Sequence, residues 1–396
     1  MQCPTRHAVR GAVAALAAVL LAAVPPAAAQ LCQTPLSIQK GDVDANIMIL
    51  LDNSGSMNEV IEHDAYDPDT AWDGGFVGTA TYMVYTSGWY TINSRNAFLV
   101  AAPNGEPGRY FGNYLNWVFW TADADQRAAL PQLTKLDVAQ EVIKGFVDRT
   151  TDVFIGLSVF DYDTGARILA ECGEEPAVIK SRVDAVAGTA WTPLGEAMED
   201  LLDYFRRTDD DAPIQYDCQQ SFIIVVTDGL PTHDRDVSPY LWDADGDGND
   251  PGDCTSIGAP YDDDLGCSDH VDDVAYWARH NDLIDWLGEP DEAWEDGQTV
   301  VTYTIGYDVD HPLLAETAAN GDGLYLSASD AAELWASLET IMVNVRQRVA
   351  AGSAVAVVSS ESADTDWLFR GKYKPTQWMG FVECFAQPYR DRLLPL

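Results

Sequence analysis

An apolar run that ends abruptly in polar residues constrains this chain more than any other feature. Ile47–Leu51 is continuously apolar, as expected for a strand buried on both faces of a parallel sheet. Asp52 follows directly, and Ser54 and Ser56 come next at alternate positions. One carboxylate and two hydroxyls at a strand end are hard oxygen ligands of the kind that Mg²⁺ and Ca²⁺ prefer. Three ligands are too few, so further groups must come from elsewhere in the chain.

Two later stretches offer the missing ligands. Ser221–Asp228 is a second apolar run that ends in a carboxylate. Thr192 precedes Pro193 at the start of an amphipathic segment, which predicts Thr192 as the N-cap and Pro193 as the first helical residue. A hydroxyl at this helix start could close a cation site formed by two strand ends. The alternative is that the serine-rich segment is only a turn and a helix cap.

These polar residues together resemble the von Willebrand factor type A domain and its metal-ion-dependent adhesion site. The family pattern is D-x-S-x-S, then a Thr, then an Asp, and it is matched in chain order by Asp52, Ser54, Ser56, Thr192 and Asp228. The resemblance implies that the hydroxyls contact Mg²⁺, or alternatively Mn²⁺ or Ca²⁺. It also implies that an acidic group of a protein partner completes the coordination of the ion.

Alternating strand and helix patterns predict an α/β fold with a doubly wound, mostly parallel sheet flanked by helices. The domain is expected over residues 46–350, with long insertions at about 58–133 and 229–268. The remaining predicted strands are Val153–Phe160, Ala166–Ala170 and Thr299–Ile305. The predicted helices are Leu136–Asp148 capped by Thr134, Pro176–Val186, the segment from Thr192 to Phe205, Asp269–Trp286, and a long helix capped by Asp330.

The first insertion is rich in Trp, Tyr, Gly and Asn, including the segment RYFGNYLNWVFW. Aromatic residues at this density could form a binding surface, as they do at many protein interfaces. They could equally form the small core of a subdomain that lies on the main sheet.

The second insertion contains acidic residues at the spacing of a calcium-binding loop. Asp243, Asp245 and Asp247 occupy alternate positions, Gly248 follows at the sixth position, and Asn249 comes next. The twelfth position is Cys254 instead of a bidentate Glu, so other acids, such as Asp250, Asp253 or Asp262–Asp264, would have to close a Ca²⁺ site. The alternative is a solvated acidic loop.

Composition and the ends of the chain bear on partners and location. With 23 Lys and Arg against 63 Asp and Glu, the formal net charge is −40, which argues against nucleic acid or an anionic membrane as the main partner. Residues 1–29 have the pattern of a secretory signal peptide, and 30–45 form a polar lead-in. No later segment reaches membrane-spanning length. We therefore expect an exported protein with no integral membrane segment after signal removal.

Removal of the signal peptide leaves six cysteines, an even number that favours disulfides in an exported chain. Sequence alone does not select among the pairings. Cys254 with Cys267 is the best local candidate, because the two residues bracket one acidic loop.

Several stretches also resemble the N-terminal part of the PilY family of type IV pilus biogenesis factors and tip adhesins. They are Gly112–Trp117 (GNYLNW), Thr192–Ala197 (TPLGEA), Val225–Gly229 (VVTDG), Tyr303–Asp308 (YTIGYD) and Trp367–Gly380. In that family the last segment leads into a C-terminal β-propeller. The sequence ends at Leu396, so residues 351–396 resemble the start of a truncated propeller, in a natural short form, a fragment or half of a split protein.

The resemblance implies a secreted, metal-dependent adhesion or assembly module of type IV pilus biogenesis. Its location would be the periplasm, the outer membrane or the cell surface at the pilus, and its partners pilins, minor pilins or a host or surface ligand. One alternative is a structural envelope protein whose metal only stabilises the fold. Another is a metal-assisted hydrolase. The scattered histidines and the absence of the usual hydrolase motifs from the sequence argue against it. We expect a protein that is not an enzyme.

Overall fold

The computed structural model describes residues 44–216, 219–246, 248, 266, 268–284, 298–352, 367–374 and 379–386. The larger of two compact units spans Val43–Val349, and the smaller unit contains the C-terminal segment from Ala350. The expected signal peptide and nearly all of the lead-in lie outside the described residues. No helix of the described chain is long and apolar enough to cross a membrane.

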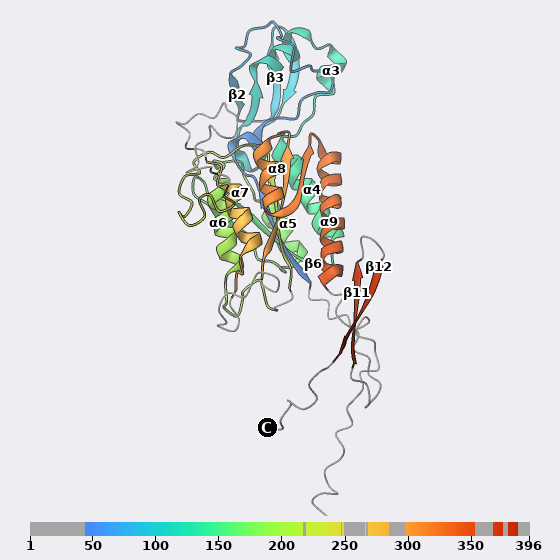
Figure 1. The fold of residues 1–396 in the computed structure, drawn as a ribbon. Helices are drawn as coiled ribbons and strands as arrows, with labels where there is room; N and C mark the ends of the chain where they lie inside the picture. Colours follow the sequence, from blue (N-terminus) through green and yellow to red (C-terminus); the bar gives the residue numbers. More distant parts are fainter. Residues whose placement is uncertain are drawn as a thin grey trace, which may run out of the picture. The chain divides into compact units, whose positions relative to one another are not determined.

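A six-stranded sheet forms the centre of the larger unit (Figure 1). Its strands, in spatial order, are β10 (Asp322–Ala328), β9 (Val300–Tyr307), β8 (Ser221–Thr227), β1 (Ala45–Leu51), β6 (Val153–Phe160) and β7 (Ala166–Ala170). All neighbours are parallel except β6 and β7. Every residue of β1 and β8 is buried, as their continuous apolar runs predict. The prediction of a doubly wound, mostly parallel sheet is confirmed.

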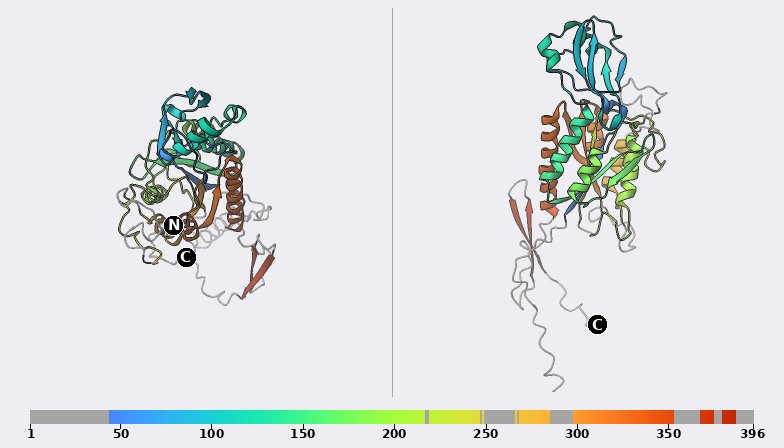
Figure 2. Two further views of the ribbon diagram at one scale, coloured as in Figure 1. Left: turned by 90° about the horizontal axis from the view of Figure 1, so that it is seen from above. Right: turned by 180° about the vertical axis from the view of Figure 1, so that it is seen from behind.

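Helices cover both faces of this sheet, and alternate residues of β1 point into two separate cores. Ile47 and Ile49 belong to the core beneath α4 (Lys135–Arg149), α5 (Pro176–Asp184) and α9 (Ala331–Gly352), and α4 and α9 are seen on this face in Figure 2, right. Met48 and Leu50 pack in the other core, beneath α6 (Leu194–Phe205), α7 (Val271–His280) and α8 (Pro312–Asn320). The sheet is therefore buried on both sides, and its strands end in polar residues at the carboxyl edge.

The predicted capping of α4 is confirmed, whereas that of α6 is wrong. Thr134 caps α4 in a capping box with Asp137. Helix α6 begins only at Leu194, with Pro193 at the N-cap position and no side-chain cap of its own. The carboxylate of Asp234 accepts the backbone N–H groups of Gly195 and Glu196 instead, at 2.9 Å each. A segment of the second insertion thus caps this helix, and Thr192 is left clear of it.

Four other elements differ from the sequence-based expectation. Helices α5 and α7 are shorter than predicted, and residues 285–286 of the predicted helix Asp269–Trp286 lie outside the described residues. Helix α8 and strand β10 have no counterpart in the prediction. Strand β10 is the edge strand of the sheet and mostly half-buried, so it lacks the continuous apolar run that identified β1 and β8.

The first insertion forms a subdomain with its own hydrophobic core. It contains two antiparallel strand pairs, β2 (Thr81–Val84) with β5 (Gly108–Phe111) and β3 (Gly88–Ile92) with β4 (Arg95–Leu99). Short helical segments complete it: η2 (Pro103–Gly105), α2 (Gly112–Asn116), η3 (Trp117–Thr121) and α3 (Ala124–Ala128). The short helix η1 (Gly55–Asn58) precedes the insertion and packs in the main core through Met57. Most of its aromatic side chains pack in this core. The aromatic residues thus form the core of a subdomain, which was one of the two alternatives, and it lies beyond the carboxyl ends of the parallel strands (Figure 1).

The GNYLNW segment holds this subdomain together. Asn113 accepts the N–H of Trp72 and donates to the carbonyl of Thr70 and the hydroxyl of Tyr66. Asn116 is fully buried and makes three hydrogen bonds to the backbone of Trp72 and Phe76. The motif that carries the most specific part of the pilus resemblance therefore has a structural role, because its amides replace backbone partners for an irregular loop.

Cys172 is a free thiol, contrary to the expectation that the mature cysteines pair. Its sulfur lies against Gly156, and burial raises the pKa of the thiol to about 12. The side chains of the other cysteines, including the proposed Cys254–Cys267 pair, lie outside the described part of the chain.

The smaller unit is described as an antiparallel hairpin of β11 (Trp367–Lys374) and β12 (Met379–Ala386). The hairpin is consistent with a β-rich extension, and its resemblance to the start of a propeller remains a prediction.

Candidate metal centre

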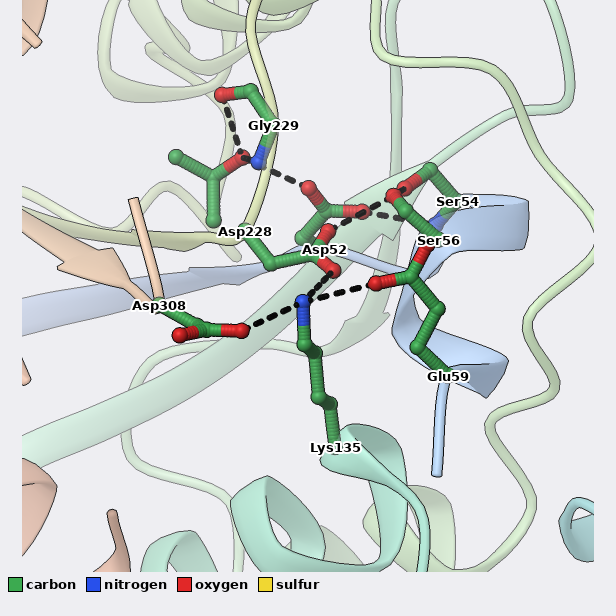
Figure 3. A network of polar contacts seen from close by, with 9 residues as sticks. Asp52, Ser54, Ser56, Glu59, Lys135, Asp228, Gly229 and Asp308 are labelled. Carbon is green, nitrogen blue, oxygen red and sulfur yellow. Dashed lines mark hydrogen bonds and ion pairs between the residues drawn. The ribbon is translucent and has the colours of Figure 1, made fainter. Parts of the chain in front are cut away.

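Asp52 begins the candidate site at the point where β1 ends. Its side chain is fully buried. One carboxylate oxygen accepts the backbone N–H of Ser54 at 2.6 Å, and the other accepts the hydroxyl of Thr227 at 2.6 Å. Because Thr227 is the last residue of the neighbouring strand β8, the carboxylate is held rigidly between two strand ends (Figure 3). Thr227 is not among the predicted site residues, because a threonine at the end of an apolar run also fits a buried strand.

Ser54, Ser56 and Asp228 form a continuous polar chain beside Asp52. The hydroxyl oxygens of Ser54 and Ser56 are 2.8 Å apart, and the Ser56 hydroxyl donates to Asp228 at 2.7 Å. Neighbouring ligands of an octahedral Mg²⁺ with bonds of about 2.1 Å stand about 3 Å apart. The spacing of the two hydroxyls therefore fits two adjacent positions around such an ion.

Thr192 approaches the same place from the loop before α6. A side chain at Gly229 would lie 3.7 Å from the Thr192 hydroxyl and 3.9 Å from that of Ser56, so both hydroxyls face the Gly229 backbone. The backbone N–H of Thr192 donates to the hydroxyl of Thr232, which fixes the loop. The fold thus gathers all five predicted ligands at the carboxyl ends of β1 and β8. Their binding of a metal ion remains a prediction.

Lys135 is part of this site and was missed by sequence reasoning. Its ammonium lies 2.9 Å from Glu59, 3.0 Å from Asp308 and 3.3 Å from Asp228, as Figure 3 shows. Lys135 is the first residue of α4, where the helix dipole disfavours a positive charge. Burial also opposes its charge, but the carboxylates of Asp228, Glu59 and Asp308 outweigh burial and raise the pKa of Lys135 above its usual range. The only sequence signal for this role was a lysine at an unfavourable helix position.

The two aspartates of the site carry more negative charge than their surroundings neutralise. Burial raises the pKa of Asp52. Burial and the neighbouring charge of Asp52 raise the pKa of Asp228 to about 7, although Lys135 and the Ser56 hydroxyl act in the opposite direction. A divalent cation between the hydroxyls and these carboxylates would supply the missing positive charge. The donor set therefore suits a hard divalent ion in both chemistry and charge.

A cavity of about 890 Å³ opens beside Lys135, between the first insertion and the strand-end loops. The basic residues of its lining are Lys135 and Arg109. The acidic residues are more numerous: Glu59, Glu62, Asp64, Asp69, Asp308 and Asp330. A ligand that reaches the metal position past this cavity meets mainly negative charge.

Glu62 in this cavity makes stability depend on pH. Burial, and then the charges of Asp308 and Glu59, raise its pKa to about 7 from an unfolded value of about 4.5. The folded state therefore holds its proton more tightly, and stability falls as pH rises from about 4.5 to about 7. We expect Glu62→Gln to remove this loss and to be more stable than wild type at pH 8 by about 1 kcal/mol, after allowance for its partial exposure.

Chemical unfolding in chelator at pH 4.5 and pH 8 tests this expectation. The two proteins should be nearly equal in stability at pH 4.5 and differ at pH 8. Asp64→Asn, which removes a charge from the same cavity at an exposed position, is the control. An equal gain for Asp64→Asn would show that only the general negative charge matters.

The predicted calcium loop is described in part. Asp243 accepts the backbone N–H of Gly248 at 2.7 Å, and Asp245 accepts the side-chain amide of Asn320 at 2.8 Å. Asp247, Asn249 and the acids expected to close the loop lie outside the described residues. Two acids of α7 approach Asp245 instead: Asp273 accepts its backbone N–H at 3.4 Å, and Asp272 contacts the same Asn320 amide at 3.3 Å.

Comparison with known proteins gives distant structural matches. No protein-family model and no curated protein matches the sequence. The vWF domain of the type V pili tip protein Mfa5 from Porphyromonas gingivalis is 13% identical, with 82% of this chain and 99% of that chain covered and a TM-score of 0.35. The hypothetical protein BatB from Bacteroides thetaiotaomicron is 12% identical, with 76% and 98% covered and a TM-score of 0.37.

A third match is proximal thread matrix protein 1 from the mussel byssus, whose metal-ion-dependent adhesion motif is occupied by zinc. It is 13% identical, with 76% of this chain and 46% of that chain covered and a TM-score of 0.33. Likenesses this distant carry no argument about function. The von Willebrand factor type A-like fold is supported by this chain's own strand order and helix layers.

Proposed function

We propose that this protein is a metal-dependent adhesion or assembly module of the type IV pilus system. An ion held by Asp52, Ser54, Ser56, Thr192 and Asp228 would bind an acidic group of a partner such as a pilin, a minor pilin or a surface ligand. The observation that carries the proposal is the pair of serine hydroxyls 2.8 Å apart beside two buried carboxylates. The pilus assignment rests on the GNYLNW and neighbouring sequence motifs. An exported location follows from the signal peptide pattern.

The chemistry of the site favours ligand binding over catalysis. Hydroxyl ligands carry no charge and leave a bound Mg²⁺, Mn²⁺ or Ca²⁺ electrophilic enough to accept a carboxylate from a partner. The basic side chain next to the site is Lys135, whose ammonium is held by three carboxylates and cannot act as a general base at neutral pH. Ester or phosphoester turnover that Asp228→Ala abolishes would instead favour a hydrolase.

The acid-lined cavity sets the chemistry of the partner around its coordinating carboxylate. Like charges placed close together oppose binding, so partner groups that enter the cavity should be basic or neutral. We therefore propose a partner surface on which one acidic residue is surrounded by basic or uncharged residues.

Binding of the purified protein to immobilised type IV pili, in Mg²⁺ and in EDTA, tests the proposal. We expect Mg²⁺-dependent binding that Ser54→Ala with Ser56→Ala weakens at least about tenfold, because both substitutions remove proposed metal ligands. Ser181→Ala, at an exposed position of α5, is the matched control. Equal binding by the double variant and the control, with both folded, would contradict the metal bridge.

The structural-metal alternative makes a different prediction about the apo protein. If the ion only stabilises the fold, EDTA should unfold the protein, and pilus binding should follow the folded fraction. Under the adhesion proposal, the circular dichroism of the apo protein stays native while binding is lost. Lys135 supports the second outcome, since it supplies a positive charge to Asp228 without any metal.

A further inference from the structure

A second group of carboxylates is buried away from the adhesion site, where helix α7 meets the second insertion. Asp272 and Asp273 stand in the first turn of α7, and each is only 1% exposed. Asp245 of the insertion reaches them from the side. Its backbone N–H donates to Asp273, and the Asn320 amide from the end of α8 bridges Asp245 and Asp272. Two carboxylates from distant parts of the chain thus share one amide, and the third accepts the backbone N–H of Asp245.

Two carboxylate oxygens of this group have no hydrogen-bond partner within the described part of the chain. Asp272 Oδ1 and Asp273 Oδ2 are both buried and unsatisfied, and the nearest basic atom to the latter is His270 Nδ1 at 3.6 Å. Among the described residues, no lysine or arginine contacts either carboxylate. A buried carboxylate oxygen without a partner is costly, and proteins normally pair such groups or coordinate a metal with them. These oxygens therefore point to a missing cation.

The charges in the group also oppose one another. Burial, and then the carboxylates of Asp273, Asp245 and Glu316, raise the pKa of Asp272 to about 8. No three acidic, His or Cys side chains of the described residues are already placed to hold a metal ion. A cation bound among the three carboxylates would have to draw them closer, and it would offset their mutual repulsion.

We propose that Asp245, Asp272 and Asp273 form a Ca²⁺ site that joins the second insertion to helix α7. Ca²⁺ suits the group because it takes six to eight oxygen ligands in flexible geometry and tolerates several carboxylates. Asp245 also belongs to the acidic repeat that has the spacing of a calcium loop. Asp272 and Asp273 of α7 would replace the bidentate Glu that usually completes such a loop at its twelfth position.

The proposed ion would act on the segment behind the adhesion site. Between Asp228 and Asp245 the chain contacts the loop of Thr192 through Thr232 and caps helix α6 through Asp234. Fixing Asp245 on α7 would hold this segment at its far end. The two proposed sites share no ligand, so substitutions can remove the ligands of one site and leave those of the other in place.

Thermal unfolding in Ca²⁺ and in chelator tests the proposal, with Ser54→Ala and Ser56→Ala as the background that removes the first ion. We expect Ca²⁺ to raise the Tm of this background by several degrees. Adding Asp272→Asn and Asp273→Asn should abolish this Tm shift. The same substitutions should lower the affinity for Ca²⁺ at least about tenfold in calorimetric titration. In chelator the same substitutions should raise the Tm, because they remove buried like charges while keeping shape.

Asp203→Asn, an exposed residue of α6, is the control for the loss of a negative charge and should keep the full shift. Single Asp272→Asn, with one charge removed, is a second variant in case the double substitution fails to fold. A background Tm that millimolar Ca²⁺ leaves unchanged would overturn the proposal. So would a shift that persists after both α7 acids are replaced.

Discussion

Lys135→Met is expected to lower the free energy of unfolding in chelator by about 3 kcal/mol, because it leaves a buried carboxylate without its cation. Asp228 has a fully buried side chain, and Glu59 is mostly buried, so both lose a partner that water cannot replace. Asp308 is more than half exposed and contributes little. Methionine keeps much of the apolar stem, which separates the loss of charge from the loss of packing.

The same substitution should strengthen binding of Mg²⁺. The lysine ammonium is a fixed positive charge within 3.3 Å of a proposed metal-site carboxylate, and its removal both ends a repulsion and frees Asp228. Mg²⁺ should therefore bind at least about tenfold more tightly and recover part of the lost stability. Chemical unfolding in EDTA and in Mg²⁺, together with calorimetric titration, measures both effects.

Lys144→Met is the matched control, since Lys144 lies on the same helix and pairs with two carboxylates that are more than half exposed. Surface pairs of this kind contribute about 1 kcal/mol or less. Equal stability losses for the two variants would show that Lys135 does not neutralise a buried site. Weaker Mg²⁺ binding by Lys135→Met would place the ion away from Asp228.

Asn116→Ala is expected to open the first insertion, at a cost of about 3 kcal/mol. Its amide accepts the N–H of Phe76 and donates to the carbonyls of Trp72 and Phe76, and all of these groups would lose their partner. The loop also packs closely on the amide: a side chain at Gly74 would lie 2.0 Å from Asn116 Oδ1. Alanine at position 116 would supply none of these hydrogen bonds and would leave space beside Gly74.

Native-state hydrogen exchange measures this effect, because the insertion has its own core and can open while the sheet stays folded. Amides of residues 63–80 should exchange faster in Asn116→Ala, and those of β1 and β8 should be unchanged. Asn96→Ala, an exposed residue of β4, is the control and should stay within about 0.5 kcal/mol of wild type. Similar exchange in both variants would mean that the amide does not hold the loop.

The Lys135→Met and Asn116→Ala variants test two different parts of the molecule, the strand-end site and the first insertion. The strand-end residues and Lys135 concern charge at a proposed binding site. The GNYLNW segment holds the loops of the first insertion in place. The cavity is lined by Asn113 of this segment and by Lys135 of the strand-end site. A distorted insertion would therefore alter partner selectivity without altering the metal ligands.

The sequence by itself determined the elements whose signals are local. The apolar runs of β1 and β8 identified buried parallel strands, since a strand covered on both faces needs no polar alternation. Thr134 and Asp137 located the start of α4, because a capping box involves residues only three positions apart. The D-x-S-x-S spacing, with Thr192 and Asp228, marked the candidate ligands because these residues match the pattern of the resembled family in chain order.

Only the tertiary structure decided the features that depend on distant pairs. Lys135 meets Asp228 across 93 residues, and Asp234 replaces Thr192 as the cap of α6 across about 40. Asp245 meets Asp273 across 28. Hydrophobic periodicity and motif spacing in the sequence do not predict such pairs. The free energy of a buried charge depends on which carboxylates and amides the fold brings within about 3 Å. The candidate ligands could therefore be found in the sequence, whereas the charged residues around them could not.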